Sequence, residues 1–250
     1  MFFVWKYRLA MFSMPWREII NQFINCKIEP TFWFFIPLFM VYISMPLLSL
    51  LANARRRRLL WFITGCAFIS ISILPLTFSL LQVPFNYALN LPVTGGYVLF
   101  VLLGYILSVT EIKRPVRYAL YAFALLCACL RYFGTYFPSI EQQAIVKTFW
   151  GYMNLPSVGL AVGVFIWYKH QNWERLFKTE RAQAIISEVA SAGFGVYLIH
   201  MFVLRHITDW FHVNIYSGWW RTLGALAVYM VSLTITLIAR RIPVIRRLFP

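Results

Sequence analysis

The chain has 250 residues, of which 61% are hydrophobic and 12% are charged, and its mean hydropathy is +0.69. Soluble domains contain roughly 45–50% apolar and about 25% charged residues, so this composition excludes a disordered chain, a nucleic-acid-binding domain and an ordinary water-soluble enzyme. The 23 Lys and Arg against 8 Asp and Glu give a net charge of +15. In a membrane protein such an excess is typical of cationic loops held in the cytoplasm, and we expect no nucleic-acid partner.

The first thirty residues do not resemble a complete membrane span. Their apolar start, MFFVWKYRLAMF, would form a helix about 18 Å long, whereas the hydrocarbon core of a bilayer is about 30 Å thick. The same segment is basic and contains Lys6, Arg8, Arg17 and Lys27. We interpret residues 1–30 as the outer end of a span whose beginning is missing. The alternative is an interfacial helix with its aromatic side chains at the lipid headgroups.

Seven long apolar runs follow, joined by short connections. Their length and hydropathy predict membrane-spanning helices. The expected fold class is all-α, a multi-pass transmembrane helix bundle of about seven spans plus a partial N-terminal helix. Residues 1–250 would then form a single integral membrane domain, with the bundle in residues 31–250. The runs are 31–53, 59–77, 95–110, 117–134, 153–168, 188–205 and 221–239.

Clusters of Lys and Arg follow the first, third, fifth and seventh runs. The connections at 78–94, 135–152 and 206–220 contain a single cation, Lys147. Cytoplasmic loops of membrane proteins are enriched in Lys and Arg, so this alternation predicts that the clustered loops and the C-terminus lie in the cytoplasm. The clusters are Arg55, Arg56, Arg57 and Arg58; Lys113, Arg114 and Arg117; Lys169, Arg175, Lys178 and Arg181; and Arg240, Arg241, Arg246 and Arg247.

Small residues at helical spacing predict where neighbouring spans approach closely. Gly159 and Gly163 form a G-x-x-x-G step in the fifth run, and the sixth run has a four-residue repeat of small residues that ends at Gly195. Between the fourth and fifth runs, segment 138–150 has the pattern of a short amphipathic helix on the membrane surface.

Two ionisable side chains lie within or at the end of apolar runs, where such groups are costly and favour a functional interpretation. Arg131 ends the stretch YALYAFALLCACL. It either snorkels to the interface or lines a cavity that binds an anionic or sugar substrate. His200 shares one helical face with Gly193 and Tyr197, which suits a buried polar pocket. The alternative is a histidine that is hydrogen-bonded between helices.

Beyond His200, Arg205 and Asp209 are spaced for an i, i+4 pair if the helix continues, and we include both as pocket candidates. His206 and His212 do not have a metal-ligand spacing, and we expect no metal. The sequence contains no P-loop, no G-x-G-x-x-G and no G-x-S-x-G. Its glutamates lie in or beside connections, which argues against a proton-driven transporter, because such carriers place carboxylates within their spans.

Three apolar stretches contain characteristic combinations of aromatic residues with glycine, proline or histidine. They are TFWFFIPLFMVYISMPLL (Thr31–Leu48), GGYVLFVLLGYILS (Gly95–Ser108) and SAGFGVYLIHMFVL (Ser191–Leu204). In order and spacing they resemble spans of the bacterial membrane acyltransferase-3 family, and the resemblance covers nearly the whole chain from about Thr31.

This resemblance implies a bundle of membrane helices in the bacterial inner membrane that transfers acyl groups, often acetyl from acetyl-CoA, to cell-surface glycans or lipid-linked sugars. It implies acyl-CoA as co-substrate, no bound cofactor, and the lipid bilayer and a glycan acceptor as partners. Tyr197 and His200 match the late family motif and are therefore pocket candidates. Arg131, Arg205 and Asp209 are candidates from the residues alone.

The chain departs from the family pattern near its start. The family has an Arg and a His in its first span and an R-x-x-R after the second. Arg55 and Arg58 have that spacing but follow a later span, so we interpret them as a cytoplasmic anchor. The catalytic residues are therefore unassigned, and we expect the 250 residues alone to have little or no acyltransferase activity. A transporter or flippase for glycan intermediates and a non-catalytic membrane scaffold remain as alternatives.

Overall fold

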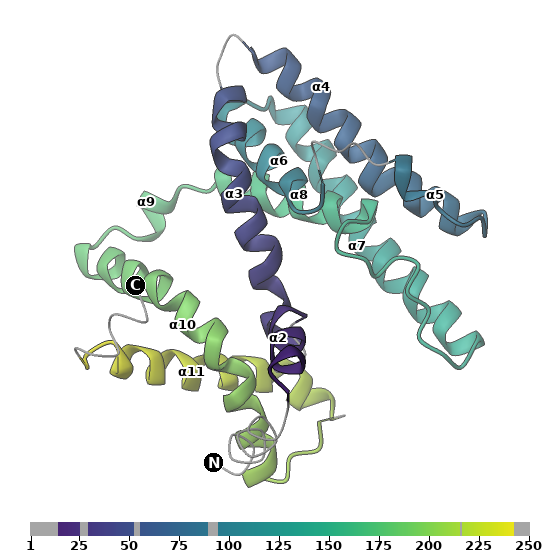
Figure 1. Cartoon of the computed structure of the whole chain (residues 1–250). Helices are drawn as coiled ribbons and strands as arrows, with labels where there is room; N and C mark the ends of the chain where they lie inside the picture. Colours follow the sequence, from purple (N-terminus) through teal and green to yellow (C-terminus); the bar gives the residue numbers. More distant parts are fainter. Residues whose placement is uncertain (1–14, 26–29, 53–55, 90–94, 216, 243–250) are drawn as a thin grey trace. The chain divides into compact units, whose positions relative to one another are not determined.

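The computed structural model describes residues 15–25, 30–52, 56–89, 95–215 and 217–242, and its regular elements there are all helical (Figure 1). The contacts divide the chain into two compact units. One comprises Phe34–Gln171, and the other combines Met1–Trp33 with Asn172–Pro250. A single integral membrane domain stays a prediction. Most of the proposed partial span lies outside the described residues. Within the described residues, the first helix is α2 (Trp16–Ile24).

Each of the seven apolar runs forms a helix, which confirms the all-α membrane bundle. Five helical segments are long and apolar enough to cross a membrane, and two apolar helices are shorter. In the unit Phe34–Gln171 the helices are α3 (Phe35–Leu51); α4 (Arg57–Phe68), continued by the π-helix η3 (Ile69–Ile73) and α5 (Leu74–Leu80); η4 (Tyr87–Leu89); α6 (Val98–Val109); α7 (Arg114–Glu141); and α8 (Leu155–Lys169). The short helix η1 (Pro30–Phe34) directly precedes α3, and all of it except Phe34 is assigned to the other unit. The other unit contains, besides α2, α9 (Trp173–Leu176), α10 (Glu180–Trp210), the π-helix η6 (Trp220–Gly224) and α11 (Ala225–Ala239).

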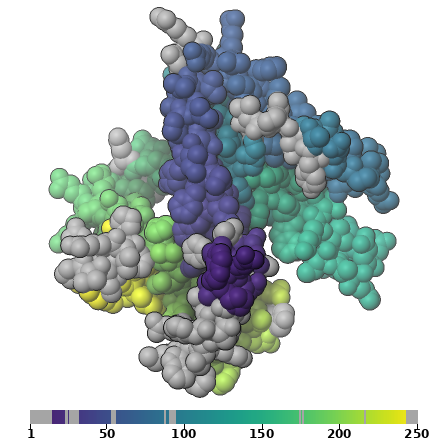
Figure 2. All heavy atoms as spheres, in the orientation of Figure 1, coloured from purple at the N-terminus to yellow at the C-terminus, as the bar shows by residue number. Residues whose placement is uncertain are grey.

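The two short apolar helices, α6 and α8, contribute fully buried side chains at the centre of their unit. At 1.5 Å per residue they are only about 18 and 22 Å long, less than the roughly 30 Å of a hydrocarbon core. Leu99 and Ile106 of α6 and Ile166 of α8 are fully buried. By contrast, the span that contains α3 has none of its apolar window buried, and α3 lies along the surface in Figure 2. The seven predicted spans are therefore refined to five long helices and two shorter ones.

Lys169, the last residue of α8, caps the C-terminus of α6. Its Nζ donates hydrogen bonds to the carbonyl oxygens of Leu107, Ser108 and Thr110, at 2.7, 2.9 and 2.8 Å. The last carbonyls of a helix have no partner within the helix and favour a positive charge. One cation that the sequence assigns to a loop cluster thus fixes the relative position of α6 and α8.

α7 and α8 pack side by side through the predicted glycine step (Figure 1). A Cβ added at Gly159 would lie 2.6 Å from the Sγ of Cys127, and one added at Gly163 would overlap the Cβ of Ala124. Only glycine therefore permits this approach. The surface helix predicted at 138–150 is wrong, because α7 continues to Glu141 and turns follow it.

In the other unit, α10 and α11 pack side by side in opposite chain directions (Figure 1). The core between them contains Ala192, Val196 and Leu233. Gly195, at the end of the small-residue repeat, is buried. At one end of the pair the Arg240 guanidinium donates a 2.6 Å hydrogen bond to the Ser191 hydroxyl. Ser191 of the repeat therefore contacts the end of α11 and Gly195 is buried, whereas Ser187, the first residue of the repeat, is exposed.

Candidate functional site

The unit that contains α10 and α11 has a cavity of about 750 Å³, here called the α10 pocket. It is lined by one face of α10, by η6 and by the first turns of α11. The chemically active side chains in its lining are Tyr197, His200, Arg205, Thr208, Trp220, Arg221 and Tyr229.

His200 is held in a defined orientation by its own helix. Its Nδ1 lies 2.6 Å from the carbonyl oxygen of Tyr197. A carbonyl oxygen only accepts hydrogen bonds, so Nδ1 donates its proton and Nε2 keeps a lone pair. The tyrosine ring lies beside the imidazole, with 5.6 Å between ring centroids. His200 is half-buried, and within the described part of the chain this hydrogen bond is its one polar contact. The backbone carbonyl thus orients the imidazole and leaves Nε2 as the ring nitrogen that is open to a ligand in the cavity.

Two arginines bring positive charge to the same cavity. Arg205 is half-buried and stands on α10 slightly more than one turn beyond His200, while Arg221 is exposed and comes from η6. The added residue in a π-helix shifts the side chains that follow it, and such segments are frequent at functional sites. Trp220 is buried and packs against Gly224, where an added Cβ would lie 2.6 Å from the Trp220 ring. η6 therefore places Arg221 on the pocket wall.

This arrangement suits acyl-transfer chemistry. An imidazole nitrogen can take up a proton, and the positive charges of Arg205 and Arg221 on the wall of the same cavity suit an anionic oxygen. Along α10, His200 lies about 30 Å from the helix start at Glu180. The pocket therefore lies at the end of α10 that is distant from the basic loop preceding it.

The structure brings together three of the five candidate residues. Tyr197, His200 and Arg205 line the α10 pocket. α10 continues through Asp209 as the spacing requires, but Asp209 is exposed and lies outside the pocket lining. Arg131 belongs to the other unit and lines a separate cavity.

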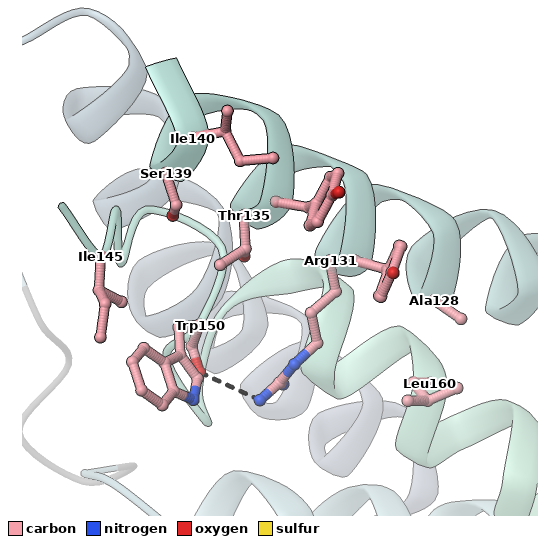
Figure 3. Close-up of a pocket in the computed structure, with 10 residues that line it drawn as sticks. Ala128, Arg131, Thr135, Ser139, Ile140, Ile145, Trp150 and Leu160 are labelled. Atoms are coloured by element: carbon pink, nitrogen blue, oxygen red, sulfur yellow. Dashed lines mark hydrogen bonds between the residues drawn. The ribbon is translucent and has the colours of Figure 1, made fainter. Parts of the chain in front are cut away.

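Arg131 lies in an open cavity of about 640 Å³ beside α7, here called the α7 groove (Figure 3). Its Nη2 donates a 3.2 Å hydrogen bond to the carbonyl oxygen of Trp150, and its Nη1 donates to the Ser157 hydroxyl. Ser157 in turn donates to the carbonyl of Gly151 at 2.7 Å. The guanidinium is therefore fixed by the first turn of α8 and by the chain that leads into it.

Sequence reasoning missed Arg221 and Thr208, which join the α10 pocket. One signal was available, because Arg221 is an isolated cation at the start of the seventh run, directly after a connection without Lys or Arg. Among the described residues, no group of three or more His, Cys, Asp and Glu is placed to hold a metal ion. The described cysteines Cys66, Cys127 and Cys129 are free.

Comparison with protein families gives one result. A family model described as "Acyltransferase domain" matches residues 5–241, which is nearly the entire chain. No curated protein and no solved structure matches the chain significantly. The α10 pocket, with Tyr197 and His200, lies within the matched region.

Proposed function

Because the chain belongs to the acyltransferase-3 family, we propose that it transfers an acyl group from acyl-CoA to a hydroxyl of a cell-surface glycan in the α10 pocket. The chain is an acyltransferase of that family and a multi-pass membrane protein. The acetyl donor, the glycan acceptor and the place of reaction are the proposal. The observation that supports them best is His200, whose Nδ1–carbonyl contact leaves Nε2 as a proton acceptor within the pocket.

The proposed reaction follows from these groups. Nε2 of His200 accepts the proton of a sugar hydroxyl, and the sugar oxygen forms a bond to the thioester carbonyl carbon. Arg205 and Arg221 stabilise the negative charge that develops on the carbonyl oxygen. The carbon–sulfur bond then breaks, and the thiolate of coenzyme A takes the proton from His200. Atoms and charges balance without a metal or a redox partner.

We place the protein in the bacterial inner membrane with its C-terminus in the cytoplasm. The cation clusters after α3, α6, α8 and α11 support this orientation, because Lys and Arg are retained on the cytoplasmic side. A green fluorescent protein fused after Pro250 should fluoresce, and an alkaline phosphatase fused there should be inactive. The opposite result for both reporters would contradict the proposed orientation.

The proposed activity is tested by expressing the 250 residues in a strain that lacks glycan O-acylation. Because His200, Arg205 and Arg221 line one pocket, we expect mass spectrometry of the surface glycan to detect new acyl esters, in contrast to the little or no activity expected from the sequence. No esters, despite membrane-inserted protein, would overturn the proposed activity and agree with the low activity expected from the sequence. Glycan movement into vesicles without acylation would favour the transporter. A non-catalytic scaffold would produce neither acylation nor glycan movement, and deletion of the protein would then give no phenotype.

A further inference from the structure

The α7 groove is separate from the proposed site and has its own chemistry. Its lining is mostly apolar or aromatic, and the exceptions are Arg131, Thr135 and Ser139. Tyr132 and Tyr136 lie on successive turns of α7 and stack with 5.8 Å between ring centroids. Trp150 closes the side opposite α7, as Figure 3 shows. The result is an apolar trough with one fixed positive charge.

The position of Arg131 along α7 suggests a depth in the membrane. Arg131 lies seventeen residues after Arg114, which corresponds to about 25 Å along the helix. With Arg114 at one headgroup region, Arg131 comes just inside the opposite edge of a hydrocarbon core about 30 Å thick. A cation at that depth is costly unless an anion or polar groups approach it. Tyrosine and tryptophan around it are typical of the membrane interface.

The groove matches an amphiphile better than a sugar. A bound sugar needs hydrogen-bonding partners for several hydroxyls, but Ser139 already accepts a 3.0 Å hydrogen bond from the backbone N–H of Val146. A lipid phosphate needs only the guanidinium and a hydroxyl, and its acyl chain needs an apolar wall such as that formed by Ala128 and Leu160. The two hydrogen bonds of Arg131 to the protein leave further guanidinium N–H groups for an anion.

We propose that the α7 groove binds an anionic phospholipid of the bilayer, with its phosphate on Arg131 and Thr135 and an acyl chain along Ala128 and Leu160. This inference does not depend on the proposed acyl transfer. Basic pockets between membrane helices are suited to anionic headgroups, because the positive charge and the apolar wall act together.

The test measures retained lipid by native mass spectrometry after the full chain is released from nanodiscs. The nanodiscs contain phosphatidylcholine with or without phosphatidylglycerol. The chain should retain phosphatidylglycerol about tenfold more strongly than phosphatidylcholine, as expected for one charge-assisted pair. Arg131→Gln should abolish this preference. Ala128→Trp, which keeps Arg131 but fills the apolar wall, should reduce retention of both lipids.

The matched control is Arg117→Gln, which removes another arginine of α7 that is not part of the groove. It should change retention by less than about twofold, because distant surface charges contribute little. Equal retention of the two lipids, or an unchanged preference in Arg131→Gln, would overturn the proposal. Displacement of the lipid by soluble glycerol phosphate would assign the site to free phosphate and likewise overturn it.

Discussion

Replacing Gly163 by leucine is expected to lower the free energy of unfolding by about 3 kcal/mol, the upper end of the usual cost of overpacking. Even a single Cβ at this position would overlap the Cβ of Ala124 and lie 3.6 Å from the carbonyl oxygen of Leu120. Backbone cannot move aside as a flexible side chain does, so α7 and α8 would have to separate. Because α8 also holds α6 through Lys169, the separation would affect the whole interior of this unit.

Alanine variants isolate the steric cause. Gly163→Ala should destabilise the protein, whereas Gly104→Ala adds a Cβ that meets no atom within 4 Å and should be neutral or stabilising. Both variants gain about 1 kcal/mol of helix propensity, so the difference between them reports the contact. Ala124→Gly should restore much of the stability lost in Gly163→Ala. Denaturation of the detergent-solubilised chain measures all three variants, and equal stability of the two alanine variants would refute the explanation.

The sequence predicted this close approach because the information is local. Glycines four residues apart occupy one face of a helix, whichever partner packs there. The depth of each helix was less predictable. α6 and α8 have the composition of membrane spans, and only packing shows that Leu99 and Ile166 are buried by protein rather than by lipid. The turns that follow Glu141 were not predicted. Residues 138–141 belong to α7, and the amphipathic pattern of 138–150 does not show that the preceding helix extends into this segment.

The residues of the candidate site were likewise predictable only in part from the sequence. Tyr197 and His200 share one face of one helix, so their spacing placed them together without knowledge of the fold. Arg205 was a candidate because of its spacing from Asp209, and only the structure places it in the pocket. Arg221 comes from η6, and its position depends on how α11 packs beside α10 and on a π-helical segment that no spacing rule detects. Arg131 was recognised by its depth, but its partner Ser157 lies across the α7–α8 contact. The residues that share one helix face were predictable, and the residues of other helices that they meet were not.

Replacing His200 by asparagine is expected to reduce glycan acylation by about 10²–10⁴-fold, the usual contribution of a positioned general base. Asparagine is polar and similar in reach, but its amide cannot accept a proton at neutral pH. The turnover number should therefore fall with little change in the KM for acyl-CoA, because the missing step occurs only in the transition state. The thermal stability of the variant should remain close to that of the unchanged chain.

His206 provides the matched control on the same helix. Its Nδ1 also contacts a backbone carbonyl, that of Phe202 at 2.8 Å, and its ring packs on Phe202 with 3.9 Å between centroids. It is absent from the lining of the α10 pocket, so His206→Asn removes a similar imidazole without removing the proposed base. Activity should fall in His200→Asn and persist in His206→Asn. Equal activity in the two variants would show that the proton acceptor lies elsewhere, because the two histidines differ chiefly in the cavity that His200 faces.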